Sequence, residues 1–293
     1  MGDNKTRPKR QRVRKVLLLV SFLLLPVTMF YFSPYLIIDG GSHGLVVASF
    51  IVFSALFLVS LVAGRLWCGW LCPMGGCQEY SAALLRDKRA RGGRYNWIKF
   101  FIWVPWLAGI VFAFAKAGGI RSVQPFYHFD YGVTVASWQN IFFVLAIVAL
   151  LVVLGVTTGR RGFCHYVCWI SPFMIVGRKI SNTARLPGLR LLAYKDLCID
   201  CKKCTQVCPM SLDVNALVKS GSMEDSECNL CGECADSCPR DVFSYRFCRP
   251  VKCNTGARHR FRFLSIPAFI ISNGKEHRLV LLRHALVKHC LTA

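Results

Sequence analysis

Acidic residues are scarce in this chain of 293 residues, in which 15 Asp and Glu stand against 37 Lys and Arg for a net charge of +22. So strong a positive charge raises the question of nucleic-acid binding, but no zinc-finger or RNP-like motif accompanies the basic residues. They gather instead beside apolar runs, which is typical of charges that flank membrane spans. We therefore expect membrane lipid, and no nucleic acid, as the partner of this charge.

The sequence also lacks the fingerprints of several redox cofactors. No glycine-rich flavin or nicotinamide motif follows a predicted strand, and the nearest pattern, Gly75-Gly76, opens a predicted helix. The haem-attachment motif C-x-x-C-H is missing as well. The chain does have 16 cysteines, and a redox function would depend on them.

Half of the cysteines fall in two runs with the same spacing, C-x2-C-x2-C-x3-C-P, which end at Pro209 and Pro239. In this spacing the first three thiolates of a run hold one 4Fe-4S cluster and the fourth reaches the neighbouring cluster. A structural zinc site needs only four ligands around a single ion. It would therefore explain neither the third cysteine of each run nor the repeated proline. We therefore predict two crossed ligand sets. The cluster-one set is Cys198, Cys201, Cys204 and Cys238, and the cluster-two set is Cys228, Cys231, Cys234 and Cys208.

Long apolar runs account for a hydrophobic content of 54% and a mean hydropathy of +0.41. Four of them, residues 16–38, 45–66, 97–115 and 141–156, are interpreted as membrane spans. The first run is longer than the apolar core of a cleavable signal peptide. The predicted fold is an all-α membrane bundle of four transmembrane helices in two pseudo-symmetric hairpins, followed by a small α+β two-cluster ferredoxin module.

The distribution of Lys and Arg predicts how the spans are oriented. The N-terminal tail carries 7 of these residues, segment 65–99 carries 7 and segment 158–195 carries 7, against 0 in loop 39–44 and 2 in loop 116–138. Basic loops stay in the cytoplasm. We expect a multi-pass protein of the inner membrane whose termini and cysteine runs lie in the cytoplasm, where thiols remain reduced.

A shorter cysteine motif appears twice, once after the second apolar run and once after the fourth. Each copy reads C-x3-C, with Cys68 and Cys72 in the first and Cys164 and Cys168 in the second. The repetition predicts that the two pairs face each other at the cytoplasmic edge of the bundle. These residues, called the four-cysteine group below, could then hold a further iron-sulfur centre or a metal. Two alternatives stay open: small buried residues that ease helix packing, and a redox-active thiol pair.

Four segments follow from these patterns. Residues 1–15 form a basic cytoplasmic tail, 16–186 the transmembrane domain, 187–250 the ferredoxin-type module, and 251–293 a basic C-terminal tail without an assigned role. The module is acidic, with nine acids and five bases over 196–246, which offers a docking face to a basic partner. Cys248, Cys253 and Cys290 fit no cluster motif and are predicted to be free thiols.

Acid–base candidates are few. A membrane part without flavin, nicotinamide or haem motifs must exchange electrons with a lipid-soluble carrier, and a quinone or quinol is the expected substrate. The loop after the third run carries His128 and Asp130, a histidine near a carboxylate that suits proton uptake during quinol oxidation. His165, inside the second C-x3-C copy, is a further candidate as a ligand or proton acceptor. Aromatic anchoring at the membrane surface is the alternative for both histidines.

The order of these motifs resembles the NapH family, the membrane quinol-dehydrogenase components associated with periplasmic nitrate reductase, and related polyferredoxin-like membrane proteins. The resemblance covers residues 15–250 and includes the two C-x3-C copies and the twin cysteine runs. One position departs from it, because Trp169 follows Cys168 whereas Pro73 follows Cys72. The resemblance implies electron transfer from the quinol pool towards a periplasmic reductase through a partner iron-sulfur or cytochrome subunit.

Three functions are therefore compared. The first is an electron-transfer subunit of quinol-dehydrogenase type rather than a stand-alone enzyme. The second is a membrane ferredoxin-type assembly or regulatory protein for a respiratory metalloenzyme. The third is a membrane anchor for a soluble-type ferredoxin, which would need no cysteines in the C-x3-C copies.

Overall fold

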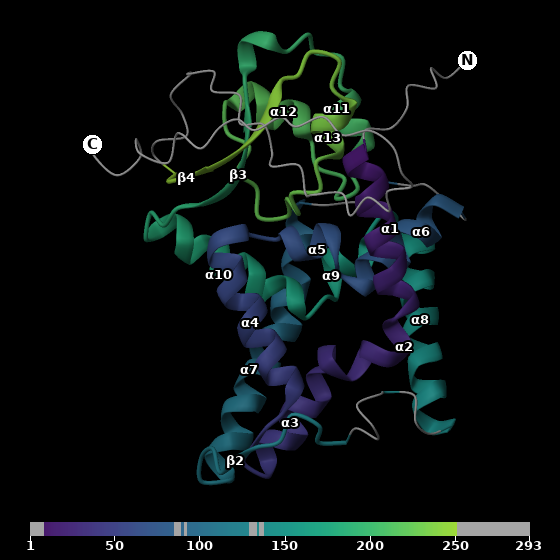
Figure 1. The fold of residues 1–293 in the computed structure, drawn as a ribbon, viewed down its shortest axis with the longest axis vertical. Helices are drawn as coiled ribbons and strands as arrows, with labels where there is room; N and C mark the ends of the chain where they lie inside the picture. The colour runs from purple at the N-terminus through teal and green to yellow at the C-terminus, as the bar shows by residue number, and fades with distance from the viewer. Residues whose placement is uncertain (1–8, 85–88, 91–92, 129–133, 135–137, 251–293) are drawn as a thin grey trace, which may run out of the picture. The chain divides into compact units, whose positions relative to one another are not determined.

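The computed structural model describes residues 9–84, 89–90, 93–128, 134 and 138–250, all within one unit of the chain that comprises residues 1–257. This part of the chain is mostly helical (Figure 1). The C-terminal tail, residues 1–8 and Asp130 lie outside the described residues.

The first apolar run does not form one continuous helix. Its axis bends by 58° where the helix over Lys9–Leu23 gives way to Leu25–Phe32. Pro26 and Pro34 explain the breaks, because each stands at the start of a new helix and lacks the N–H that would continue the preceding one. The expectation of one span over 16–38 is corrected to a broken one. The elements formed are α1 (Lys9–Leu23), α2 (Leu25–Thr28), the 3-10 helix η1 (Met29–Phe32) and α3 (Pro34–Ser42).

Two helices in the described residues are long and apolar enough to cross a membrane, over Tyr95–Lys116 and Asn140–Thr158. They match two of the four predicted spans, and the bent segment from α1 to η1 would be a third. The remaining run forms α4 (Ala48–Ala63), whose 16 residues are fewer than the about 20 that a span requires. These helices therefore support two or three of the four predicted membrane spans, and the bundle of four spans stays a prediction. The two candidate spans comprise η2 (Gly93–Trp97) with α7 (Ile98–Lys116), and α8 (Trp138–Thr158).

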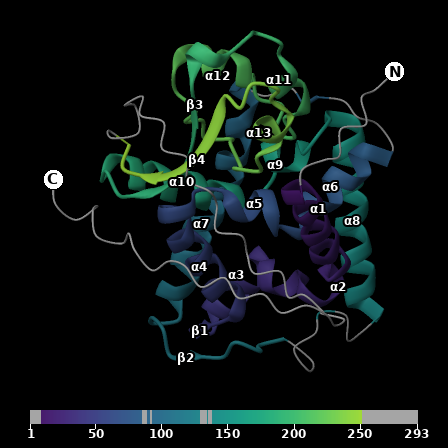
Figure 2. The ribbon, with the colours of Figure 1, turned by 45° about the horizontal axis from the view of Figure 1, so that its top comes forward.

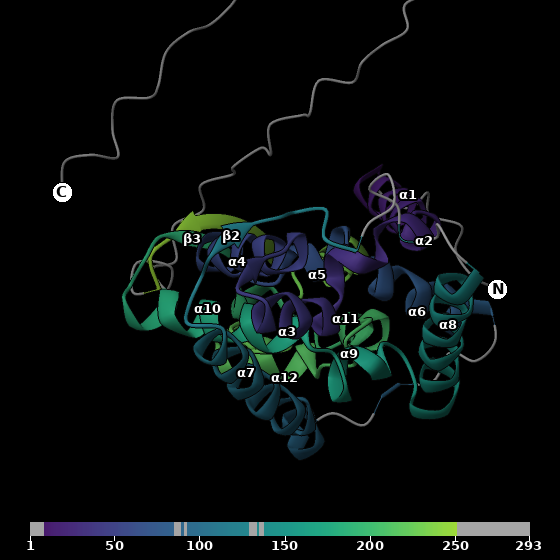
Figure 3. The same ribbon diagram turned by 90° about the horizontal axis from the view of Figure 1, so that it is seen from below.

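The two halves of the repeat are packed crosswise. The helix after the first C-x3-C copy, α6, lies against α8 of the second half, and the helix after the second copy, α10, lies against α4 of the first half (Figure 3). Small residues permit both approaches, because a Cβ on Gly155 would lie 3.2 Å from the Ser81 hydroxyl and one on Gly177 only 1.8 Å from the Ser60 hydroxyl. The elements of the two copies are α5 (Leu66–Trp70), α6 (Pro73–Leu84), α9 (Gly162–Tyr166) and α10 (Ile170–Thr183).

The ferredoxin-type module is a small α+β unit, as predicted (Figure 2). Its first and last strands pair antiparallel, from Gly188 opposite Cys248 to Ala193 opposite Phe243. This pairing closes the module on itself. Its elements are β3 (Gly188–Ala193), η3 (Lys195–Leu197), α11 (Lys203–Val207), α12 (Val214–Ser220), α13 (Glu233–Ser237) and β4 (Phe243–Cys248). Elsewhere, β1 (Leu45–Val46) and β2 (Ser122–Val123) form a short parallel pair.

A buried ion-pair network joins the helical part to the module. Glu227 of the module accepts hydrogen bonds from Arg65 at 2.8 Å and from Lys99 at 2.6 Å. The three side chains are at most 4% exposed. We call them the buried charge triad. Since two cations face one carboxylate, the triad carries a net charge of +1 when all three groups are ionised.

Other carboxylates of the module also pair with basic residues of the same chain. Because these partners come from α1 and α10 as well as from the module's first strand, the acidic charge is used within the molecule. These acids are therefore not available to the basic partner for which an acidic docking face is predicted, and that face stays a prediction. The pairs are Arg10 with Asp236, Arg14 with Glu233, and Arg178 and Arg190 with Glu224.

Replacement of Glu227 by Gln should lower the free energy of unfolding by about 3–5 kcal/mol, because Arg65 and Lys99 would be left as buried cations without a carboxylate. Denaturation of the purified chain in detergent measures this change. The control is Asp200→Asn, which breaks the exposed pair with Lys219 and should leave stability unchanged. Equal stability of the Glu227 variant and the parent would show that the triad does not stabilise the contact between the module and the helical part.

Candidate metal centres

The cluster-one set surrounds one cavity of the module. Cys198, Cys201, Cys204 and Cys238 all line an empty volume of about 330 Å³, together with Val218 and other apolar residues. Three of these cysteines come from the first run and the fourth from the end of the second. The grouping is the one that the spacing predicts.

The cluster-two set surrounds a second cavity. Cys208, Cys228, Cys231 and Cys234 line an empty volume of about 390 Å³ whose wall also includes Leu191. Here the fourth cysteine is supplied by the first run. The structure therefore brings each predicted set of four thiols together, with the runs crossing over.

Local backbone geometry produces this crossover. In each run a residue in the left-handed region, Lys202 (φ 56°) or Gly232 (φ 79°), leads into a helix of five residues. The fourth cysteine then leaves the helix in an extended conformation, at φ −63° and ψ 116° for Cys208 and φ −76° and ψ 123° for Cys238. A residue before proline is restricted to this region, so the C-P ending directs the last thiol away from its own run.

The donor chemistry of both cavities fits an iron-sulfur cluster. Each set consists of four thiolates, the ligands of 4Fe-4S clusters. Within the described parts of the chain, no three His, Cys, Asp or Glu side chains are close enough to hold a single metal ion. The residues present therefore fit two clusters.

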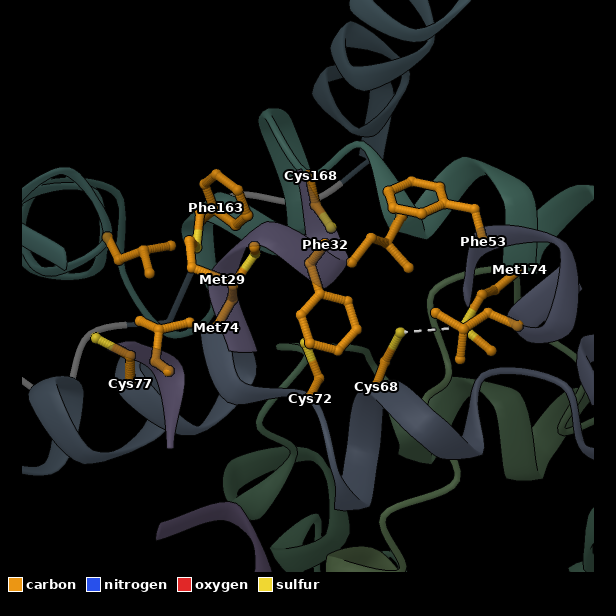
Figure 4. Packing of buried hydrophobic residues seen from close by; sticks show 14 of the residues in the cluster. Met29, Phe32, Phe53, Cys68, Cys72, Met74, Cys77, Phe163, Cys168 and Met174 are labelled. Carbon is orange, nitrogen blue, oxygen red and sulfur yellow. Dashed lines mark hydrogen bonds between the residues drawn. The ribbon is translucent and has the colours of Figure 1, made fainter. Parts of the chain in front are cut away.

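The four-cysteine group lies at the junction of the helical part and the module. All four thiols are buried, and Figure 4 shows Cys68, Cys72 and Cys168 directed into one apolar core that also contains Met174. Cys164 belongs to the apolar core of the module. The backbone folds alike in both copies, because the N–H of Cys72 bonds to Trp67 at 3.0 Å and that of Cys168 to Phe163 at 2.9 Å.

The thiols of this group influence one another. Burial, together with smaller effects of the neighbouring Cys164 and Cys68, raises the pKa of Cys168 to about 12. Burial also raises the pKa of Cys72 well above its usual value, with added contributions from the other three thiols of the group. The structure thus places the two pairs near each other.

Sequence reasoning missed the basic residues around this group. Arg65 and Arg161 each stand three residues before the first cysteine of a C-x3-C copy, a repeat that the sequence contains and that would have found them. Arg161 donates to the carbonyl of Cys68 at 2.6 Å and to Glu79 at 2.7 Å. Burial alone would raise the pKa of Glu79, but Arg161 and Arg14 outweigh it and lower this pKa to about 2.

The two predicted histidines lie in different places. His165 is fully buried, with its Nδ1 2.9 Å from the Asn96 side chain, and burial lowers its pKa to about 4 despite a smaller opposing effect of Glu227. His128 is 55% exposed, and its Nε2 lies 3.1 Å from the carboxylate of Asp39. The predicted partner Asp130 is outside the described residues, so the carboxylate seen beside His128 is one that the sequence did not single out.

His128 lines an apolar pocket. Its volume is about 750 Å³, and the wall consists of aromatic and aliphatic side chains with a few polar groups. Such a composition is typical of small-molecule sites. The lining residues are Phe30, Ser33, Tyr35, Leu36, His128, Asn140 and Phe143.

One cysteine outside the motifs differs from its prediction. Cys248, at the end of β4, is disulfide-bonded rather than free. Cys253 and Cys290 are outside the described residues.

Comparison with sequence models of protein families finds two matches. A model described as a 4Fe-4S binding domain matches residues 45–92 and 140–184, which contain the two C-x3-C copies. A model described as a 4Fe-4S dicluster domain matches residues 197–243, which contain both cysteine runs. The chain therefore carries 4Fe-4S ferredoxin-type domains.

Several curated proteins are similar over much of the chain. YccM of Escherichia coli, whose name refers to electron transport, is 23% identical over 73% of this chain and 60% of its own length. The ferredoxin-type protein MauN of Methylorubrum extorquens, named for methylamine utilization, is 28% identical over 72% of each chain. The regulatory protein NosR of Pseudomonas aeruginosa is 28% identical over 65% of this chain but 27% of its own length. No solved structure matches the chain.

Exchange of the last cysteine of each run tests the crossover. Cys208→Ser should abolish the cluster bound with Cys228, Cys231 and Cys234, although Cys208 belongs to the first run, because it lines the second cavity. Cys238→Ser should abolish the other cluster. Low-temperature EPR of each variant, combined with the complementary Cys201→Ser and Cys231→Ser changes, identifies which signal is lost. If Cys208→Ser removed the same signal as Cys201→Ser, the ligand sets would not cross.

Proposed function

We propose that this chain is a membrane-bound iron-sulfur electron-transfer protein that exchanges electrons between the quinone pool and a partner redox subunit. The observation that carries this proposal is the grouping of eight cysteines around two adjacent cavities in crossed sets. The 4Fe-4S domain matches over the same residues support it. When bound, the clusters supply one-electron transfer.

The surface near the cluster-one set suits a partner that exchanges electrons. Cys201 is exposed, and the neighbouring Ile199 is 54% exposed, whereas the cluster-two set is more enclosed. Electron transfer is fastest when the two redox centres lie close together. A partner that docks where a cluster ligand reaches the surface brings them closest. We expect the partner iron-sulfur or cytochrome subunit to bind there.

The apolar pocket beside His128 is the proposed quinone site. Its wall offers aromatic surface to a quinone ring, and His128 offers an imidazole that takes up a proton when a quinol is oxidised. The carboxylate of Asp39, 3.1 Å from Nε2 of His128, orients the imidazole ring. His165 is enclosed at the module junction and has no part in this site.

The ion pairs support the proposed multi-pass orientation. Arg14, Arg65 and Lys99 belong to the basic segments predicted to be cytoplasmic, and each pairs with a carboxylate of the module. The segments and the module therefore share one side of the protein. Given the positive-inside rule, that side is the cytoplasm, where the cysteine runs stay reduced.

Two finer assignments belong with this proposal. The NapH-type role, with a periplasmic reductase as the final acceptor, stays a prediction from the order of motifs. The alternative is a ferredoxin-type assembly or regulatory protein, which the name of the similar NosR protein favours. Quinol-dependent reduction of the clusters distinguishes electron transfer from a role in assembly.

A matched pair of histidine variants tests the quinone site. His128→Gln should slow reduction of the clusters by a quinol at least about 10-fold, because the proton acceptor is lost. His43→Gln is the control, since His43 also lies beside Asp39 but does not line the pocket. Anaerobic stopped-flow absorbance measures the rate, and reduction by dithionite shows that the clusters are intact. Equal rates for both variants and the parent would show that the quinol is not oxidised in the pocket beside His128.

A further inference from the structure

The loop that carries two ligands of cluster two is held by side chains of the helical part. This loop covers residues 226–231. At its start, Arg65 donates to the carbonyl of Ser226 at 2.9 Å, and at its end Gln11 of α1 donates to the carbonyl of Cys231 at 3.0 Å. The charged groups that accompany these contacts therefore lie next to cluster two.

The buried charge triad lies beside the first ligand of this loop. Its carboxylate, Glu227, immediately precedes Cys228. Both of its cations come from the helical part, Arg65 from the residue before α5 and Lys99 from α7. Next to Cys228, two positive charges thus face one negative charge.

The buried guanidinium of Arg14 lies beside the second ligand of the loop, Cys231. It donates at 2.7 Å to the same Gln11 side chain that bonds to the carbonyl of Cys231, and at 2.9 Å to Glu233. Burial raises the pKa of the Cys231 thiol to about 12, and the charge of Arg14 is the largest effect that opposes this rise. Arg14 therefore interacts electrostatically with a ligand of cluster two.

The contact between the helical part and the module has more cations than carboxylates. In the described part of the chain, the module contributes four carboxylates near the cluster-two loop, whereas the helical part contributes six cations and one carboxylate. The four negative charges of the module thus become a net charge of +1 once the helical part is included. The cations are Arg10, Arg14, Lys15, Arg65, Lys99 and Arg161, and the carboxylates are Asp225, Glu227, Glu233 and Asp236 of the module and Glu79 of α6.

The central cations of this contact are shielded from water. The side chains of Arg14, Arg65 and Lys99 are at most 3% exposed. By contrast, the cations that line the cluster-one cavity, Lys202 and Arg240, are exposed, and water screens their charge. The positive charge therefore acts more strongly on cluster two than on cluster one.

We propose that the buried cations of the helical part raise the reduction potential of cluster two above that of cluster one, so that cluster two takes the first electron. A cluster gains one negative charge when it is reduced, and buried positive charge nearby stabilises that reduced state. The inference rests on the proposed function for the presence of the clusters and for the quinol as donor. Each transfer moves one electron and forms or breaks no bond at the cluster. Two transfers use both electrons of a quinol, whose two protons are taken up by His128 and water.

Two substitutions in the triad test the proposal, because they change the charge next to Cys228 in opposite directions. Arg65→Gln removes a cation and leaves Lys99 paired with Glu227, so at a fixed potential the ratio of reduced to oxidised cluster two should fall about 10-fold. Glu227→Gln removes the carboxylate, and the same ratio should rise about 10-fold. A 10-fold change corresponds to about 59 mV for a one-electron couple. An EPR-monitored redox titration of the anaerobically purified full chain measures both shifts.

Two further variants are controls. Arg65→Lys keeps the charge and should keep the potential of cluster two close to that of the parent. Lys219→Gln removes an exposed cation that pairs with Asp200, between two ligands of cluster one, and should leave both potentials unchanged. The variants Cys201→Ser and Cys231→Ser assign the signals, and the line shape of the cluster-one signal shows that each triad variant is folded.

A parent chain in which cluster one has the higher potential, or shifts of the same sign in Arg65→Gln and Glu227→Gln, would overturn the proposal. An unchanged potential of cluster two in both variants would do the same. The proposed function is tested separately, by addition of a quinol. The predicted shifts without any reduction by a quinol would contradict the proposed function alone, since the titration itself uses mediators and dithionite.

Discussion

The placement of Glu227 between Arg65 and Lys99 is the interaction on which the arrangement of this protein depends. The carboxylate immediately precedes the first ligand of cluster two, while the two cations stand at the ends of an apolar helix and a candidate span. Separation of the module from the helical part would be costly, because withdrawal of Glu227 would leave both buried cations unpaired. The loop that follows Glu227 also packs on the first C-x3-C copy, where the indole of Trp70 donates to the carbonyl of Leu230.

The grouping of the cysteines around two pockets could be predicted from the sequence, because the path of the chain within each run is set locally. Spacing decides which thiols share a turn, and the proline after Cys208 and Cys238 restricts the backbone so that the fourth thiol leaves its own run. The helical boundaries were less predictable. Apolar content indicated a span over 16–38, but Pro26 and Pro34 break it, and the long helix of the second run covers only residues 48–63. The hydropathy of a segment indicates whether it avoids water, but it does not indicate the residue at which a helix ends.

Contacts between distant segments could not be predicted. The total charge indicated that basic residues outnumber acids, but pairing of Arg14 with Glu233 or of Lys99 with Glu227 depends on how helices pack, which no spacing in the sequence encodes. The crosswise packing has the same origin, although Gly155 and Gly177 are small residues of the kind that mark close helix contacts. The arginine three residues before each C-x3-C copy was visible in the sequence, but its meaning depends on the buried carboxylates that only the fold brings near.

The central claim is that electrons from a quinol reach clusters held by the crossed cysteine sets. The most direct measurement is low-temperature EPR of the whole chain, purified anaerobically in detergent, before and after addition of a quinol, with iron, sulfide and zinc analysis of the same sample. The account predicts at least about eight irons per chain and 4Fe-4S signals that a quinol produces. Stoichiometric zinc in place of iron, or iron-sulfur clusters that dithionite reduces and quinols do not, would contradict it.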